Sequence, residues 1–123
     1  MNDEETFFFD TYAFFEIIRG NPKYERYRNV IAITTIFNLA ELNYNLKKEM
    51  KDELADEFTE KYKNYLIEVE VDDIKTAMSF KNKNKQLSIP DAIGYIIANR
   101  LNIKFLTGDE GFRNFNNVEF VKK

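Results

Sequence analysis

The chain contains no histidine, no cysteine and no tryptophan. Without histidine and cysteine, Ser-His-Asp and Cys-His nucleophilic catalysis and any imidazole general base are excluded. The same two absences exclude zinc fingers, iron–sulfur clusters and disulfide frameworks. Carboxylates, hydroxyls, amides, lysine and arginine remain for polar chemistry. We therefore expect any metal bound by this chain to be a hard cation with oxygen ligands, namely Mg²⁺, Mn²⁺ or Ca²⁺.

Glycine and long apolar runs are also scarce. The chain has four glycines, and they form neither a Gly-rich phosphate loop nor a Walker A pattern. No apolar run approaches the roughly 20 residues that a membrane-spanning helix needs. The acidic run from Met1 to Glu5 has the wrong charge for a secretory signal. We expect a cytoplasmic protein without a membrane partner.

Net charge and length limit which classes of protein the chain can belong to. Charged residues make up 32% of the chain but leave a net charge of only -3, which excludes a disordered polyelectrolyte and a strongly basic nucleic-acid binder. With 123 residues, of which 44% are hydrophobic, the chain is long enough to bury a core. We expect a single domain over residues 1–123.

The hydrophobic pattern alternates between short apolar runs and amphipathic segments. The apolar runs predict strands over residues 6–9, 30–34, 66–71, 103–107 and 118–121. The other segments predict helices over residues 11–19, 36–46, 51–65 and 88–101, with a further helix that Asp72 caps. Strands alternating with helices predict an α/β fold of three layers, α/β/α, around a central, mostly parallel sheet of four to five strands.

Four acidic residues occupy positions typical of a site in such a fold. Asp10 directly follows the first expected strand, and Asp109 follows the strand at 103–107. Glu41 and Asp91 lie on helices among apolar or small residues. Ligands of open parallel sheets bind beyond the carboxyl ends of the strands. Four acids that converge there need a cation or bound protons to relieve their repulsion, so we expect a hard-metal site.

Each acid also fits a purely structural role when it is considered alone. Asp10 fits a helix cap, and Asp91 fits a helix N-terminus, where a negative charge is favourable. Asp109 fits an ordinary turn, and Glu41 a solvated helix position. The metal-site hypothesis therefore depends on the four acids acting together.

Four segments in order carry a resemblance to a known family. They are Phe8–Tyr12, Thr35–Leu42, Ile89–Ile93 and Leu106–Phe112. With their spacing, the chain resembles the PIN-domain family, and in particular the VapC-like ribonuclease toxins of prokaryotic toxin–antitoxin pairs. The resemblance covers essentially the whole chain. It implies a PIN-like sheet of strand order 3-2-1-4-5 and cleavage of RNA that depends on Mg²⁺ or Mn²⁺.

The resemblance also implies roles for individual residues. Asp10, Glu41, Asp91 and Asp109 match the acidic quartet of the family, and three of them, Asp10, Asp91 and Asp109, are expected to hold the metal. Thr11 and Thr107 match hydroxyl positions that support this site. The resemblance further implies a homodimer and an antitoxin protein that places a basic side chain in the acidic pocket.

Substrate contacts are expected from basic residues. Lys81, Lys83 and Lys85 form a cluster just before the Asp91 helix and match the needs of a phosphate backbone, as does Arg100. Arg19 and Arg113 are further candidates. A solvated helix end explains the lysine cluster equally well. Aromatic residues, which include Phe14, Phe15, Tyr24, Tyr27 and Tyr62, are mostly expected in the core, with any exposed surplus marking a partner surface.

Other functions stay open from the sequence. A PIN-like module that binds RNA or protein without cleaving it has the same fold. A nuclease of RNA maturation or RNA quality control has the same acids. A receiver-type domain is disfavoured, because its phospho-accepting aspartate follows the third strand and Asp72 here indicates a helix start. The sequence leaves the role of Glu110, beside Asp109, undecided.

Overall fold

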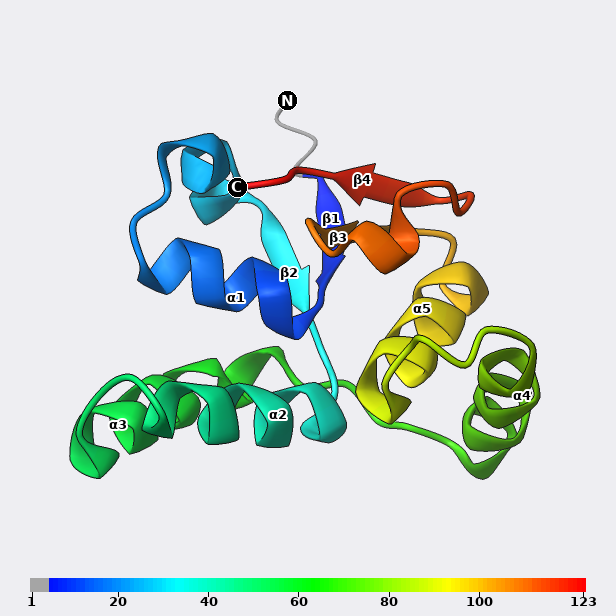
Figure 1. Cartoon of the computed structure of the whole chain (residues 1–123), viewed down its shortest axis with the longest axis horizontal. Coiled ribbons are helices and arrows are strands. Elements are labelled where there is room, and N and C mark those ends of the chain that lie inside the picture. The colour runs from blue at the N-terminus through cyan, green and yellow to red at the C-terminus, as the bar shows by residue number, and fades with distance from the viewer. Residues whose placement is uncertain (1–4) are drawn as a thin grey trace.

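A parallel sheet of four short strands forms the centre of the protein. The computed structural model describes residues 5–123, so the acidic start at residues 1–4 lies outside the described residues. The strands are β1 (Thr6–Phe9), β2 (Ile31–Ile33), β3 (Lys104–Thr107) and β4 (Val118–Phe120). All of them run parallel, in the order β2-β1-β3-β4 (Figure 1). The central strand β1 aligns Phe8 with Ile33 on one side and with Phe105 on the other.

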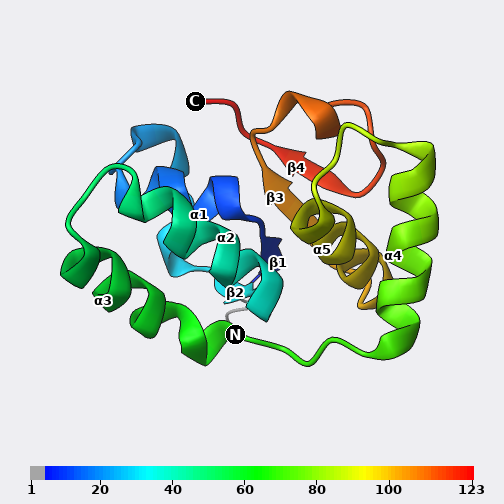
Figure 2. The same cartoon turned by 60° about the horizontal axis from the view of Figure 1, so that its bottom comes forward.

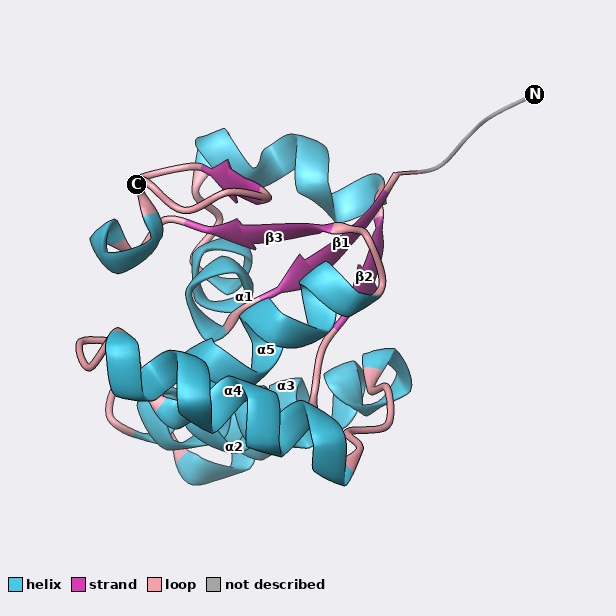
Figure 3. Cartoon of the chain, turned by 90° about the vertical axis from the view of Figure 1, so that its right-hand side faces the viewer, coloured by secondary structure: helices cyan, strands magenta, loops and turns pink. Residues whose placement is uncertain are grey.

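Helices cover both faces of this sheet. The α-helices are α1 (Thr11–Ile18), α2 (Ile36–Lys47), α3 (Asp52–Tyr62), α4 (Val71–Lys83) and α5 (Ile89–Arg100). Three short 3-10 segments are η1 (Pro22–Asn29), η2 (Lys63–Tyr65) and η3 (Glu110–Phe112). Figure 2 shows α1, α2 and α3 on one side of the sheet and α4 and α5 on the other, and Figure 3 shows how short the strands are beside the helices. The predicted three-layer α/β/α fold is confirmed.

Successive side chains of β1 point to opposite faces of the sheet and so contribute to a separate core on each face. Phe7 and Phe9 are buried in one apolar cluster with Phe14 of α1 and Leu42 of α2. Phe8, which points to the opposite face, is buried in a second cluster that α5 and β3 complete. One run of three phenylalanines therefore fixes β1 between the two helical layers.

The predicted strand over residues 66–71 is wrong. Only Leu66 pairs, through one parallel bridge to Thr34 at the end of β2. After one further hydrogen bond, from the Ile67 amide to the Thr34 carbonyl (2.9 Å), the chain leaves the sheet edge. Ile67 and Val69 pack onto the second core cluster instead of extending the sheet. The strand order implied by the resemblance holds for the four strands that form, and Leu66 lies where the third strand was expected.

The cap of α4 also differs from its prediction. The residue that caps this helix is Glu70 rather than Asp72. The Asp73 carboxylate accepts a hydrogen bond from the Glu70 amide (2.9 Å), so the helix starts earlier than expected. This earlier start consumes the last residues of the expected third strand.

Close packing of α5 on β1 depends on Gly94. A Cβ atom at this position would lie 2.6 Å from Cε1 of Phe8, whose ring is fully buried. We expect Gly94→Ala to lower the free energy of unfolding by about 1–3 kcal/mol, because the ring must shift in a filled core. Urea unfolding measures this loss. Gly111→Ala is the matched control, since its nearest neighbouring atom is 3.5 Å away, and equal midpoints for the two variants would contradict the prediction.

None of the helices within residues 5–123 is both long enough and apolar enough to span a membrane.

Candidate active site

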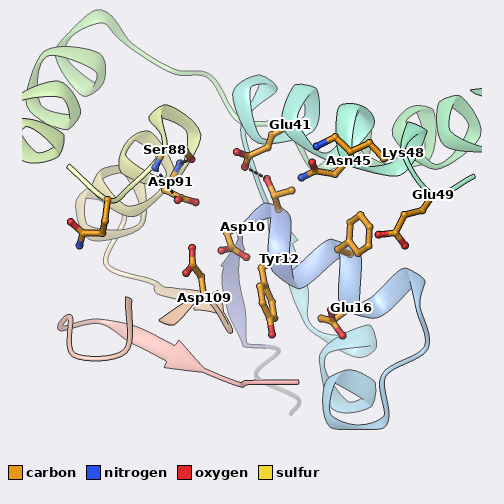
Figure 4. A pocket seen from close by; sticks show the side chains of 13 residues that line it. Asp10, Tyr12, Glu16, Glu41, Asn45, Lys48, Glu49, Ser88, Asp91 and Asp109 are labelled. Carbon is orange, nitrogen blue, oxygen red and sulfur yellow. Dashed lines mark hydrogen bonds between the residues drawn. The ribbon is translucent and has the colours of Figure 1, made fainter. Parts of the chain in front are cut away.

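The carboxyl ends of β1 and β3 open into a cavity of about 490 Å³. All four acids singled out from the sequence line it, and Figure 4 shows Asp10, Asp91 and Asp109 directed into the same space. They reach it from separate elements. Asp10 follows β1, Asp109 follows β3, and Glu41 and Asp91 lie on α2 and α5. The fold therefore brings the predicted quartet to one place.

Asp10 lies deepest, with 1% of its surface exposed. Its Oδ1 accepts a hydrogen bond from the Ala13 amide (2.8 Å), so Asp10 is indeed the cap of α1. Its Oδ2 accepts a hydrogen bond from the Thr107 hydroxyl (2.5 Å). Burial raises the pKa of Asp10 well above its usual value, and the charges of Asp91 and Asp109 raise it further, against the opposing effect of the two hydrogen bonds.

Thr107 connects Asp10 to Asp109. This fully buried hydroxyl donates to Asp10 and accepts a hydrogen bond from the Asp109 amide (3.1 Å). The Asp109 carboxylate in turn accepts from the Gly111 amide (3.0 Å), which fixes the turn after β3. The structure thus places Thr107 in direct contact with the cluster, where the resemblance expected a supporting hydroxyl.

Thr11 orients Glu41 from the neighbouring helix. Its buried hydroxyl donates to Oε1 of Glu41 over 2.7 Å, which links the first turn of α1 to α2. Among residues 5–123, no hydrogen bond is made to Oε2 of Glu41. That oxygen is therefore available to a ligand in the cavity.

Asp91 lies in the first turn of α5. It forms a capping box with Ser88, in which each side chain accepts a hydrogen bond from the other residue's amide, both over 3.1 Å. The pKa of Asp91 is raised to about 6, mainly by burial and also by the nearby charges of Glu41 and Asp109, against the opposing effect of its hydrogen bonds with Ser88. A cap alone does not explain this shift, because the cap lowers the pKa.

The donors in this cavity fit a hard divalent cation by their chemistry. Its acidic end offers carboxylate oxygens and the Ser88 hydroxyl, without nitrogen or sulfur ligands that favour softer metals. Within residues 5–123, however, no group of three or more acids stands close enough together to form a finished metal cluster. The carboxylates surround the cavity rather than meet at one point. Burial is the main cause of the raised pKa values of Asp10 and Asp91, repulsion from the neighbouring acids adds to it, and a bound cation would offset both effects.

The basic residues predicted to bind substrate are not among those that line this cavity. Arg100 lies at the other end of α5 from Asp91 and forms a two-point ion pair with the buried carboxylate of Asp73 (2.7 and 3.0 Å). Lys81 and Lys85 line a separate surface hollow beside the end of α4, and Lys83 is the last residue of that helix. A contribution of these residues to RNA binding stays a prediction.

Three other charged residues form ion pairs. They are Glu110, whose role the sequence left undecided, and the further substrate-binding candidates Arg19 and Arg113. Glu110 is exposed and pairs with Arg113 (2.7 Å) and Lys122 (2.7 Å), and these hydrogen bonds lower its pKa to about 2. Arg19 pairs with Glu49 (2.9 Å). Glu110 does not line the cavity, so its carboxylate is not part of the acidic cluster.

Sequence reasoning missed the second half of the cavity. Beyond the acids it is lined by Tyr12, Phe15, Glu16, Asn45, Lys48, Glu49 and Gln86. One signal was available, since Asn45 and Lys48 follow Glu41 by four and seven residues, the spacing of a single helix face. The aromatic pattern gave no such signal, because Phe15 adjoins the buried Phe14 and both were expected in the core.

Comparison with protein families gives one match, and it covers most of the chain. The family model described as the PIN domain matches residues 7–118. No curated protein sequence matches the chain significantly.

Solved structures share the fold at low sequence identity. A toxin–antitoxin complex from Klebsiella pneumoniae superposes with a TM-score of 0.70 at 16% identity, covering 90% of this chain and 93% of that one. VapBC2 from Rickettsia felis, bound to a promoter DNA fragment, superposes with a TM-score of 0.70 at 16% identity, covering 95% of this chain and 98% of that one. PAE2754 from Pyrobaculum aerophilum superposes with a TM-score of 0.68 at 13% identity, covering 94% of this chain and 90% of that one. At these identities the likeness concerns the fold.

Proposed function

The chain belongs to the PIN-domain family, and from this premise we propose that it is a metal-dependent ribonuclease. PIN domains are generally nucleases. The observation that carries the proposal is that four acids from four elements line one cavity, with Asp10 buried at its base. Carboxylate oxygens that can hold Mg²⁺ or Mn²⁺ beside the developing negative charge are what metal-dependent phosphodiester hydrolysis requires.

Asp10, Asp91 and Asp109 would hold the cation. When bound, it supplies charge neutralisation at the scissile phosphate and a water molecule of lowered pKa. Thr107 keeps Asp10 and Asp109 in a fixed relation, because one hydroxyl contacts both residues. The Ser88 capping box holds Asp91 at the start of α5. These contacts position the donors before substrate arrives.

Glu41 is the acid that we propose orients the attacking water. The Thr11 hydroxyl occupies Oε1 of this carboxylate, and Oε2 is left to accept a proton from a water molecule in the cavity. Thr11 is then a positioning residue, since it acts through Glu41.

Substitution of two of these acids tests the proposal. We expect Glu41→Gln and Asp91→Asn each to lower kcat/KM for RNA by roughly 100-fold, which is the lower end of the range for lost general-base catalysis and the upper end of the range for disturbed metal binding. Cleavage of an end-labelled RNA in Mg²⁺ measures the change. Asp72→Asn is the control, an exposed aspartate of α4 that does not line the cavity. Equal activity of all four proteins, wild type included, would refute the assignment.

We further propose that the protein is the toxin of a type II toxin–antitoxin pair, acting in the cytoplasm as a homodimer. Two similar structures, from Klebsiella pneumoniae and Rickettsia felis, are a toxin–antitoxin complex and a VapBC2 assembly, which supports an antitoxin partner. The acidic cavity suits a basic side chain of that partner. A short antitoxin-like reading frame directly upstream of the gene is the expected observation, and its absence would favour a nuclease of RNA maturation or quality control.

A further inference from the structure

The acidic cavity continues as a groove between α1 and α2. We call this half the α1–α2 groove, and it is lined by Phe15 and Glu16 of α1 and by Asn45, Lys48 and Glu49, which lie along and just after α2. Figure 4 shows Asn45 and Lys48 on the same side of α2 as Glu41, leading away from Asp10. The acidic end and the α1–α2 groove therefore form one continuous cavity.

An ion pair holds the far end of the groove together. Arg19 donates to both carboxylate oxygens of Glu49 (3.1 and 2.9 Å), which ties the end of α1 to the end of α2. The same guanidinium lies 4.5 Å from the centre of the Phe15 ring. Phe15 is thus a fixed, half-buried aromatic surface within the groove.

Two polar groups in the groove form no hydrogen bond or ion pair with the other described residues. Within residues 5–123, the Asn45 side-chain amide makes no hydrogen bond and the Lys48 ammonium makes no ion pair. Lys48 lies over the exposed Tyr44 ring, at 4.2 Å from its centre. The protein therefore presents one amide and one cation to whatever fills the groove.

Electrostatics make Lys48 the decisive contact for an anionic chain. It is the one basic residue that lines the cavity among the described residues, against the acids Asp10, Glu16, Glu41, Glu49, Asp91 and Asp109. Arg19 is shared between Glu49 (2.9 Å) and Glu16 (3.7 Å), and a divalent cation would neutralise the catalytic acids. Beyond the metal, only Lys48 remains to attract a phosphate.

The composition of the groove favours a nucleotide over a peptide helix. An amphipathic helix docks on a continuous apolar strip, whereas here Phe15 is followed by charged and amide side chains. A single aromatic surface beside a free amide and a free cation corresponds to the three parts of a nucleotide. Bases stack on aromatic rings, their edges hydrogen-bond to amides, and phosphates pair with lysine.

We propose that the α1–α2 groove binds the nucleotide next to the scissile phosphate, with its base stacked on Phe15, the base edge hydrogen-bonded by Asn45 and its outer phosphate paired with Lys48. This inference rests on the proposed ribonuclease function and adds its base-recognition site. Asn45 is then the residue that selects the base beside the cleavage position.

Cleavage of a mixed-sequence RNA tests the assignment. We expect Lys48→Gln to raise KM about tenfold with a smaller change in kcat, because it removes a contact to bound RNA rather than to the reacting atoms. Asn45→Ala is expected to broaden the bases found beside the cut, as read from the sequenced ends. Lys47→Gln is the matched control, because Lys47 pairs with Asp56 (3.0 Å) and does not line the groove.

Binding provides a second readout that does not need catalysis. A fluorescent single-stranded oligoribonucleotide is titrated in Mg²⁺ with the Glu41→Gln protein, alone or with Lys48→Gln or Phe15→Leu added. Each addition is expected to weaken affinity about five- to tenfold, and Lys48→Gln to reduce the salt slope by about one. Far-UV circular dichroism verifies that the Phe15→Leu protein is folded.

The outcomes separate this inference from the proposed function. RNA cleavage by the wild type with unchanged KM, base preference and affinity in the groove variants would overturn the groove assignment and leave the ribonuclease standing. RNA binding that depends on Lys48 and Phe15 without any cleavage would support the groove and overturn the ribonuclease. No RNA binding at all would overturn both.

Discussion

Asp10→Asn is expected to lower RNA cleavage by about 10³-fold or more while leaving the fold at least as stable as the wild type. The loss of activity follows from the position of Asp10, which is the most buried acid and contacts both α1 and Thr107. In the proposed function Asp10 would hold the cation. Removing a single hydrogen-bond donor to the charge of a transition state typically costs 10²- to 10³-fold, and weaker binding of the whole cation is expected to cost at least as much.

Stability is expected to hold, because the loss of one hydrogen bond is offset by the loss of a buried charge. The amide oxygen of asparagine accepts from the Ala13 amide as the carboxylate does, whereas the Thr107 hydroxyl loses Oδ2 as its acceptor and accepts from the new NH₂ group instead. The variant also removes a charge whose burial is unfavourable, as the raised pKa of Asp10 indicates.

The measurement pairs RNA cleavage with urea unfolding on the same protein preparations at pH 7.5. Asp72→Asn serves again as the control and is expected to match the wild type in both assays. If the Asp10→Asn protein is less stable than the wild type, its inactivity would be explained by unfolding. Wild-type activity in a stable Asp10→Asn protein would remove Asp10 from the active site.

Most of the fold was predictable because its local signals are strong. Apolar runs of β-branched and aromatic residues predicted β1, β2, β3 and β4 to within a residue or two. The expected strand at 66–71 shows the limit of such signals. Ile67 and Val69 of this segment are half-buried against the second core cluster, and a local pattern does not distinguish packing against a helix from pairing in a sheet.

The acidic half of the site was predictable and the groove was not. Strand ends identify Asp10 and Asp109, because parallel strands finish at one edge of the sheet. The hydrogen bonds that complete the site join residues far apart in the chain, Thr107 to Asp10 and Thr11 to Glu41, and were expected only through the family resemblance. The groove depends on how α1 and α2 are rotated about their axes, which places Phe15 at the cavity as well as against the first core cluster.

The predicted lysine cluster failed to reach the acids for a similar reason. Lys81, Lys83 and Lys85 precede the Asp91 helix in sequence, but α4 and the turn after it direct Lys81 and Lys85 toward a different hollow. Proximity in sequence to a site residue does not determine which face of a helix a side chain occupies. Lys48, 43 positions before Asp91 in the chain, lines the shared cavity instead.

Removing divalent metal is expected to reduce cleavage to background and to expose an unusual pH dependence of stability. The folded-state pKa values of Asp10 and Asp91 are raised above the usual 3.8, that of Asp91 to about 6. Between these values the folded protein binds more protons than the unfolded chain. The free energy of unfolding of the metal-free protein therefore falls as pH rises from 5 to 7.5, by about 1 kcal/mol from Asp91 alone.

Because the chain has no histidine, a change in stability between pH 5 and 7.5 can be assigned to carboxylates with raised pKa values. No imidazole titrates there, and the acids with lowered pKa values, such as Asp73 and Glu110, lose their stabilising charge only at lower pH. Mg²⁺ requires the deprotonated carboxylates and is expected to raise Tm more at pH 7.5 than at pH 5. Thermal unfolding in Mg²⁺ and in EDTA at both pH values measures this.

Asp91→Asn supplies the control for this pH dependence. The variant lacks one of the two groups with a raised pKa, so its metal-free Tm should fall less between pH 5 and 7.5, and its gain from Mg²⁺ should shrink. A metal-free wild type that gains stability over this range would show that the acids of the cavity are not held at raised pKa. Equal stabilisation by Mg²⁺ at both pH values would place the metal away from them.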